Sequence, residues 1–181
     1  MFRKRETCSA DRYRYAPDAD GIDSTAWNIL VDAVTVSRRK GTRGLSRFLR
    51  STAVPPPYAA LAKHYGAAAV CCLTSEPAGE RPSESEIRGI VRAIYPDIAR
   101  LVNSKFTRPH IESVVRELWD YEPLGKFDYG DIFVIVAAIL FALIRDNASW
   151  GPLRACVAAE LVRHPVGDWV RDWRPGEPAS D

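Results

Sequence analysis

The side chains that could catalyse a reaction or hold a metal ion are scattered along this sequence. His64, His110 and His164 fall on three different predicted helices or helix ends, and none has a cysteine or carboxylate at metal-ligand spacing. No serine stands in a nucleophile-elbow sequence, and no glycine-rich phosphate loop follows a strand pattern. The residues therefore favour binding over catalysis, and we expect neither an enzyme nor a metal or other cofactor.

The cysteines and the composition indicate a reduced protein with an ordinary globular core. Cys71 and Cys72 are adjacent, and Cys8 and Cys156 complete neither a metal-ligand spacing nor a disulfide framework. The chain has 181 residues, of which 46% are hydrophobic and 27% charged, enough for one domain with a sizeable core. No apolar run near the N-terminus resembles a signal peptide, and the terminal RPGEPASD could not anchor in a membrane. We therefore expect an intracellular protein that is either soluble and cytoplasmic or has a membrane tail that is absent from this chain.

A run of basic residues could contact anions. It comprises Arg38, Arg39, Lys40, Arg43, Arg47 and Arg50. Such a run can touch phosphates or an anionic membrane surface, but it is more often a solvated helix end, and no aromatic residues are interleaved to stack on bases. Because the net charge is only +2, we expect no nucleic-acid partner and keep peripheral membrane contact as an open alternative.

The most informative stretch is FDYGDIFVIV, residues 127–136. Asp128 can cap a helix that starts here, and Asp131 stands where a capping box places an acid. Capping does not explain Gly130, because glycine in the first turn of a helix costs up to about 1 kcal/mol relative to alanine. A missing side chain at this position would let another helix approach the backbone closely. The stretch therefore indicates a docking surface.

The apolar run that follows, IFVIVAAILFALI over residues 132–144, predicts the centre of the fold. At a rise of ~1.5 Å per residue such a helix reaches about 20 Å. A bilayer core is ~30 Å thick, and Asp131 and Arg145 flank the run with charge. A helix that is apolar on every side can instead be covered on every side by other helices. We predict a buried central helix.

Helical periodicity predicts the helices that cover this centre. Apolar stripes begin at Trp27, behind the candidate N-caps Asp23 and Ser24, and again at Tyr58, Ile87 and Ile111. No period-two pattern typical of a strand occurs anywhere in the sequence. The sequence therefore predicts an all-α bundle wrapped around one apolar helix.

The domain organisation predicted from these patterns is simple. Residues 1–22 are expected to form a flexible N-terminal segment, residues 23–174 a single helical bundle domain, and residues 175–181 a flexible C-terminal tail. The stretch TSEPAGERPSES, residues 74–85, is typical of an exposed loop. Pro96 interrupts the stripe from Ile87 to Val102, which leaves two short helices or one kinked helix as alternatives.

These features resemble the Bcl-two family of apoptosis regulators over most of residues 24–174. The helix Ile111–Trp119, which ends in Glu-Leu-Trp, is followed by a loop and then by Asp128-Tyr129-Gly130-Asp131, an order similar to the family's first homology region. Residues 132–147 and 149–164 resemble the two helices of the family's central hairpin. Trp169 lies where the second homology region places a tryptophan, and the segment Trp27–Lys40 is similar to the family's first helix.

The sequence also departs from the family pattern. Tyr129 replaces a tryptophan, and Asp131 replaces the arginine that in family members pairs with an aspartate of the bound helix. The third homology region has no clean copy, with Arg88-Gly89 its nearest trace. The last region ends in Trp173-Arg-Pro-Gly instead of Gly-Gly-Trp. A divergent member, viral or invertebrate, would accommodate all of these differences.

The resemblance implies a helical bundle around a central apolar hairpin, with a hydrophobic groove that binds amphipathic death-motif helices of pro-apoptotic proteins. The expected groove residues are Ile94, Ile98, Val114, Glu117, Leu118, Tyr129, Gly130, Asp131 and Val134. It further implies an inhibitor of apoptosis with a role in host–virus interaction, located in the cytoplasm or at the mitochondrial outer membrane, with a homodimer as a further assembly.

Three alternatives stay open at this point. Val114 and Leu118 could be plain core residues. The chain could be a pro-apoptotic member of the same family. It could also be an unrelated helical scaffold that contacts nucleic acid or a membrane through its basic run.

Overall fold

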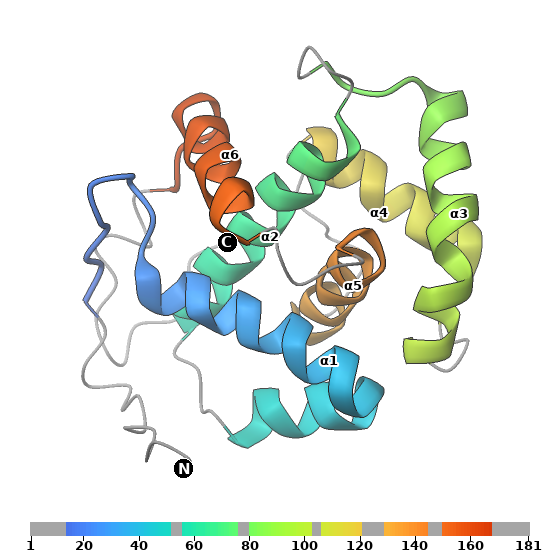
Figure 1. Ribbon diagram of the computed structural model, residues 1–181, viewed down its shortest axis with the longest axis horizontal. Coiled ribbons are helices and arrows are strands. Elements are labelled where there is room, and N and C mark those ends of the chain that lie inside the picture. Colours follow the sequence, from blue (N-terminus) through green and yellow to red (C-terminus); the bar gives the residue numbers. More distant parts are fainter. Residues whose placement is uncertain are drawn as a thin grey trace.

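The helical periodicity of the sequence corresponds to six α-helices in the computed structural model, which describes residues 14–51, 56–75, 80–102, 106–120, 129–144 and 150–167. The helices are α1 (Ser24–Ser51), α2 (Pro56–Thr74), α3 (Glu84–Val102), α4 (Arg108–Asp120), α5 (Tyr129–Leu143) and α6 (Trp150–Arg163), as Figure 1 shows. Within the described ranges no strand forms, and one isolated bridge joins Pro17 to Asp23. The predicted all-α bundle is confirmed.

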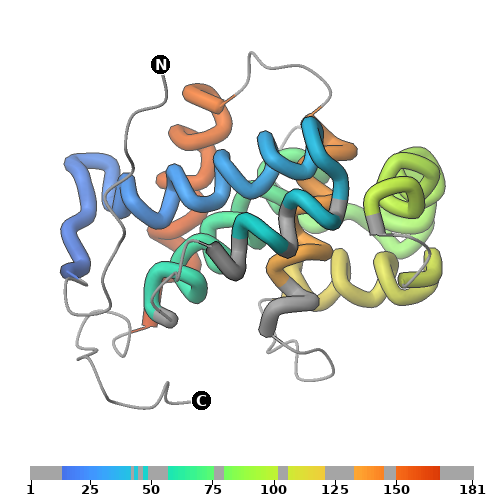
Figure 2. The backbone as a smooth tube through the Cα atoms, turned by 90° about the horizontal axis from the view of Figure 1, so that it is seen from below, coloured from blue at the N-terminus to red at the C-terminus, as the bar shows by residue number. Residues whose placement is uncertain are grey.

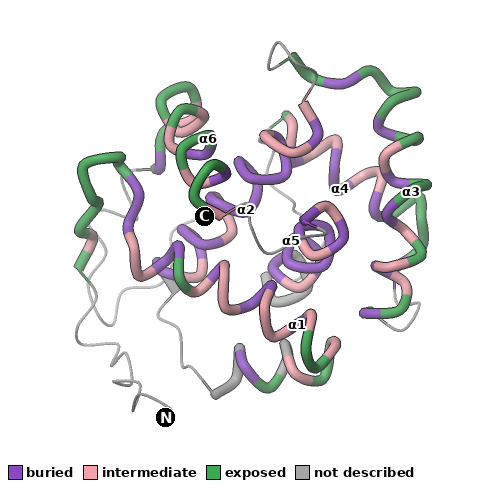
Figure 3. Tube along the Cα trace, in the orientation of Figure 1, coloured by how far each residue is buried: buried purple, intermediate pink, exposed green. Residues whose placement is uncertain are grey.

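Helix α5 lies at the centre of this bundle. It packs against α1, α2 and α3, which surround it in Figure 1. Ile135, Val136, Ile139 and Leu140 have no exposed surface, and Figure 3 shows α5 as largely buried. Because α5 has no polar face to turn toward water, each of its sides needs an apolar neighbour. The predicted burial of the apolar run is therefore confirmed over residues 133–144, whose side chains the structure describes.

Helix α2 approaches α5 closely because its contact surface is made of small residues. Its sequence, PPYAALAKHYGAAAVCCLT, is rich in alanine. A Cβ atom added to Gly66 would lie 2.5 Å from Cγ1 of Val136 and 3.3 Å from Cδ1 of Leu30. Helices α1, α2 and α5 therefore meet at this glycine, in an interior that leaves no space for a side chain.

Helix α1 bends sharply at Gly41. This residue has φ 59° and ψ −162°, a conformation that glycine adopts much more readily than residues with a Cβ. Beyond the bend the second part of the helix, teal in Figure 1, turns back under the first part. A Cβ on Gly44 would collide with the Cβ of Lys40, so a second glycine allows the two parts to come close.

Helix α3 is one helix that continues past Pro96, so the alternative of two separate helices is wrong. It starts at a capping box inside the stretch that was predicted to be a loop. The backbone N–H of Ser83 donates to Oε2 of Glu86 at 2.6 Å, and the backbone N–H of Glu86 donates to Oγ of Ser83 at 3.4 Å. These two bonds satisfy donors that the first turn of a helix otherwise leaves unpaired.

Among the described residues, helix α6 does not pair with α5 in the central hairpin that the resemblance implies. In the described part of the chain its main contact is with α2, and α5 alone occupies the centre. Only Leu153 and Val157 of α6 are fully buried, a stripe wide enough to cover one neighbouring helix. Trp150 adds an edge-to-face contact with Trp27 of α1, with ring centroids 5.9 Å apart.

Of the two candidate N-caps, Asp23 and Ser24, it is Asp23 that caps α1. Its Oδ1 accepts the backbone N–H groups of Thr25 at 2.9 Å and Ala26 at 3.1 Å, and its Oδ2 accepts that of Ala16 at 3.1 Å. The N–H of Asp23 itself donates to the hydroxyl oxygen of Tyr65 on α2 at 2.9 Å. Burial raises the pKa of Tyr65, which keeps this hydroxyl neutral. The cap therefore joins α1, α2 and the preceding segment.

Residues 14–22 belong to the segment that was predicted to be flexible, yet they make specific contacts with the bundle. Ile22 is fully buried. Arg154 of α6 donates to Asp18 at 2.7 Å and to Asp20 at 2.6 Å, and its guanidinium lies 6.0 Å from the ring centre of Trp27. Residues 1–13 and the predicted tail 175–181 lie outside the described residues. Among the helices that the structure describes, none is both long enough and apolar enough to cross a bilayer.

We predict that Gly66→Ala destabilises the protein although alanine is the better helix former. The added methyl group would overlap with Val136, and overpacking of this kind costs roughly 1–3 kcal/mol. Gly89→Ala is the matched control, because a Cβ on Gly89 of α3 meets nothing within 4 Å. This control should gain up to about 1 kcal/mol from helix propensity. Urea unfolding measures both changes, and equal shifts in the two variants would contradict the close packing at Gly66.

We predict that Arg154→Ala lowers stability by about 1 kcal/mol at neutral pH, a figure kept small because the carboxylates it meets are partly exposed. Hydrogen bonds from Ser24 and Arg154 lower the pKa of Asp18, and one from Arg154 lowers that of Asp20. This contribution is therefore present above the ordinary carboxyl pKa of 3.8 and is lost as the pH falls below it. Urea unfolding of the wild type and the variant should differ at pH 7, and this difference should shrink as the pH is lowered past 3.8 and through the lowered pKa values of the two carboxyls. A constant difference would disprove the role of these carboxylates.

Candidate functional site

The predicted groove residues of α3 and α4 lie in the hydrophobic core. Ile98 and Val114 have no exposed surface, and Ile94 and Leu118 are each only 4% exposed. They occupy the region where α3 packs against α4 and α5. In the structure as described these side chains are core residues, the role that was left open for Val114 and Leu118. A ligand could reach them only if α3 and α4 moved apart.

The remaining predicted groove residues lie on α4 and α5. Val134 of α5 is half-buried and packs against the core. Glu117 of α4 is half-buried and accepts a hydrogen bond from Oγ of Ser113 at 2.9 Å. Tyr129, Gly130 and Asp131 begin α5, but their side chains lie outside the described residues. The proposed cap Asp128 and the tryptophans of GDWVRDW, residues 167–173, also lie outside them.

Ion pairs join α4 to the first residue of α3 and to the segment just before it. Nε of Arg116 lies 2.5 Å from Oε2 of Glu84, and Nε of Arg81 lies 3.1 Å from Oδ1 of Asp120. The hydrogen bond from Arg116 lowers the pKa of Glu84, so this carboxylate stays charged at neutral pH. Arg116 is thus already engaged. Arg92 of α3 is exposed and forms no ion pair with any described residue, so it is available to an acidic group on a ligand.

The histidines do not build a metal site in the described part of the chain. Nε2 of His64 donates to the backbone carbonyl of His164 at 2.9 Å, and burial lowers the pKa of His64, so that its ring is neutral. Within the same residues no three His, Cys, Asp or Glu side chains gather as they would around an ion.

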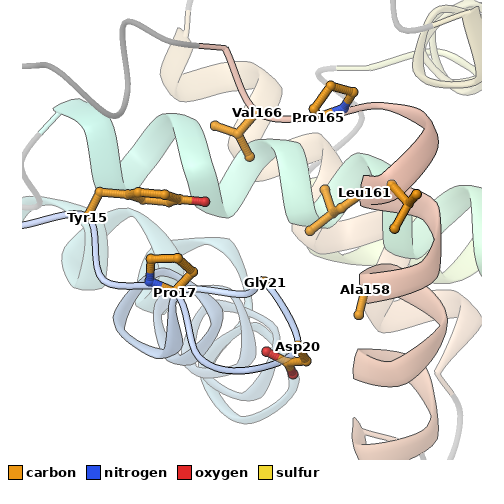
Figure 4. Close-up of a pocket in the computed structure, with 9 residues that line it drawn as sticks. Tyr15, Pro17, Asp20, Gly21, Ala158, Leu161, Pro165 and Val166 are labelled. Carbon is orange, nitrogen blue, oxygen red and sulfur yellow. The ribbon is translucent and has the colours of Figure 1, made fainter.

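One surface pocket lies between the N-terminal segment and the end of α6, and Figure 4 shows the side chains around it. It has a volume of about 430 Å³ and is lined mainly by apolar groups, among them Tyr15, Leu161 and Val166. Val162, which also lines this pocket, is 84% exposed. Sequence periodicity did not indicate this pocket, because its walls come from opposite ends of the chain.

A second pocket of about 300 Å³ lies at the bend of α1. It is lined by Val36, Lys40, Arg43, Gly44, Arg47 and Phe48. The basic run of the sequence identified three of these residues. Val36, Gly44 and Phe48 were missed, because nothing in a run of charges shows that the helix folds back on itself at Gly41.

Comparison of the chain with protein-family models, with curated proteins and with solved structures finds no match. The resemblance drawn from the motifs therefore stays a prediction. The function has to be argued from the residues and their arrangement.

Proposed function

We propose that this protein is a pro-survival regulator of apoptosis that binds amphipathic death-motif helices. One observation carries the proposal: the short helix α4, whose last turn contains Glu-Leu-Trp, precedes a helix that is apolar on all sides and occupies the centre of the bundle. This combination supports the resemblance in the sequence, in which such a pair of helices forms the wall and floor of a ligand groove. The coarse architecture, an all-α bundle, is compatible with it.

In this proposal the ligand helix enters between α3 and α4. Its apolar anchors would take over contacts that Ile98 and Val114 now make with the core. The ion pairs Arg116–Glu84 and Arg81–Asp120 oppose this opening only weakly, because exposed pairs contribute about 0–1 kcal/mol each. A ligand that binds the open arrangement of α3 and α4 more tightly than the closed one stabilises the open arrangement. The size of this effect is the difference between the two binding free energies.

The acidic group of a ligand helix would need a basic partner. In the family this partner is an arginine at the position of Asp131, and here an aspartate would repel the ligand instead. Arg92 is our candidate for the substitute, since Arg116 is already paired with Glu84. The proposal therefore implies a narrow range of ligands, limited to helices whose aspartate can reach α3.

The proposal predicts that Val134→Glu weakens binding of a death-motif peptide by at least about tenfold, because it places a charge at the half-buried groove floor. Val162→Glu on α6 is the matched control and should leave the affinity unchanged, since Val162 is 84% exposed and lies on a helix that contacts α2 instead of α3 or α4. Fluorescence anisotropy with a panel of labelled amphipathic peptides measures both affinities.

Circular dichroism establishes that each variant is folded, and Val134→Ala provides a milder change if the glutamate prevents folding. Failure of every peptide to bind the wild type at high micromolar concentration would overturn the proposal. Equal losses in Val134→Glu and Val162→Glu would show that any binding occurs outside the predicted groove.

A further inference from the structure

The bend of α1 builds a hollow whose shape depends on two glycines. Gly41 has a positive φ of 59°, and Gly44 sits where a Cβ would collide with Lys40 and lie 3.3 Å from Cγ1 of Val36. The backbone therefore folds back on itself only with glycine at these positions. The fold brings Lys40, which precedes the bend, to the same hollow as Arg43 and Arg47, which follow it. Figure 2 shows the two parts of α1 running beside each other.

No acidic side chain in the described part of the chain pairs with the positive charges of this hollow. Lys40, Arg43 and Arg47 are all exposed, and none of them forms an ion pair with a described acidic residue. Arg38 of the same basic run has a different environment, because it donates to the backbone carbonyl of Ile144 and lies 5.8 Å from the ring centre of Phe141. Three like charges around one hollow repel each other unless an anion lies between them.

The lining also limits the chemistry of that anion. Phe48 is buried and Val36 half-buried, so the floor of the hollow is apolar while its rim is cationic. Two guanidinium groups suit phosphate oxygens, which they can bind through paired hydrogen bonds, and a lysine adds a point charge. A volume of about 300 Å³ corresponds to the lower end of the range for small-molecule sites.

We propose that the bend of α1 is a binding site for a small organic phosphate that carries two or more phosphate groups. Lys40 and Arg47 hold these groups from opposite sides of the bend, and Arg43 closes the rim. The phosphates can belong to a free metabolite or to the headgroup of a lipid, which present the same chemistry to the protein. The site lies on α1 and does not depend on the proposed function of α3, α4 and α5.

The test begins with inorganic pyrophosphate and inositol hexakisphosphate, titrated by calorimetry at near-physiological salt. Arg43→Gln and Arg47→Gln should each weaken binding by about tenfold. Arg39→Gln is the matched control, because it removes the same charge from an exposed neighbour that does not line the hollow. It should change the affinity by less than about twofold. Equal losses in Arg39→Gln and Arg43→Gln would mean that diffuse charge attracts these anions, and would overturn the proposal.

The variant Gly41→Ala tests whether binding depends on the shape of the hollow as well as on its charge. This variant keeps every basic residue but strains the bend, so it should lose phosphate binding as Arg43→Gln does. Undiminished binding in a folded Gly41→Ala variant would overturn the proposal, as would tighter binding of a single-stranded oligonucleotide than of either phosphate probe. Binding of death-motif peptides, measured in parallel, should be the same in all of these variants.

Vesicles distinguish the two sources of the phosphate. Phosphatidylcholine vesicles with a minor share of phosphatidylinositol bisphosphate are compared with vesicles of equal surface charge that contain phosphatidylserine. Preference for the first kind, lost in Arg43→Gln, would assign the site to a lipid headgroup. Equal association with both kinds, together with tight binding of the free probes, would assign it to a soluble phosphate. Absence of binding to vesicles and free probes alike would overturn the proposal.

Discussion

The whole architecture depends on the need to cover α5 on every side. A helix without a polar face cannot lie at the surface of a protein in water, so α1, α2 and α3 must each bring an apolar stripe to it. The fit is closest at α2, where Gly66 lets the backbone come within reach of Val136 and Leu30. Because the centre is packed this tightly, changes in it are felt in three helices at once.

Polar interactions then fix the ends of the helices that cover α5. Asp23 connects the start of α1 to Tyr65 on α2, and Arg154 connects α6 to the acidic turn that precedes α1. Asp23 and Arg154 each form hydrogen bonds with several partners. Several bonds fix the position of a side chain better than a single exposed ion pair does. These contacts bring residues near the two ends of the described chain together. They also hold the segment before α1 beside α6, and residues of these two segments line the apolar pocket.

Much of this fold could be predicted from the sequence, and the exceptions have physical reasons. The apolar run is a local signal, and its predicted burial is confirmed over residues 133–144. The cap of α1 is a local signal too, and the structure selects Asp23 from the two candidates. The capping box Ser83–Glu86 is a local signal too, but it begins inside the stretch 74–85, whose Pro, Gly and Ser residues are typical of a loop. The packing of α6 on α2 could not be predicted, since its apolar stripe does not specify a partner. The role of Val114 could not be predicted either, because a residue in a groove wall and a residue in the core have the same helical spacing. Only the complete burial of Val114 in the structure identifies it as a core residue.

Native-state hydrogen exchange tests the burial of α5 most directly. If α5 is the covered centre of the bundle, the amides of residues 135–140 should exchange only through global unfolding and should be the slowest in the protein. Amides of α6, which is covered by α2 on one stripe, should exchange faster through local opening. Exchange in α5 that is as fast as in α6, or faster, would contradict the account, because the helix on which every other contact depends would then be open to water.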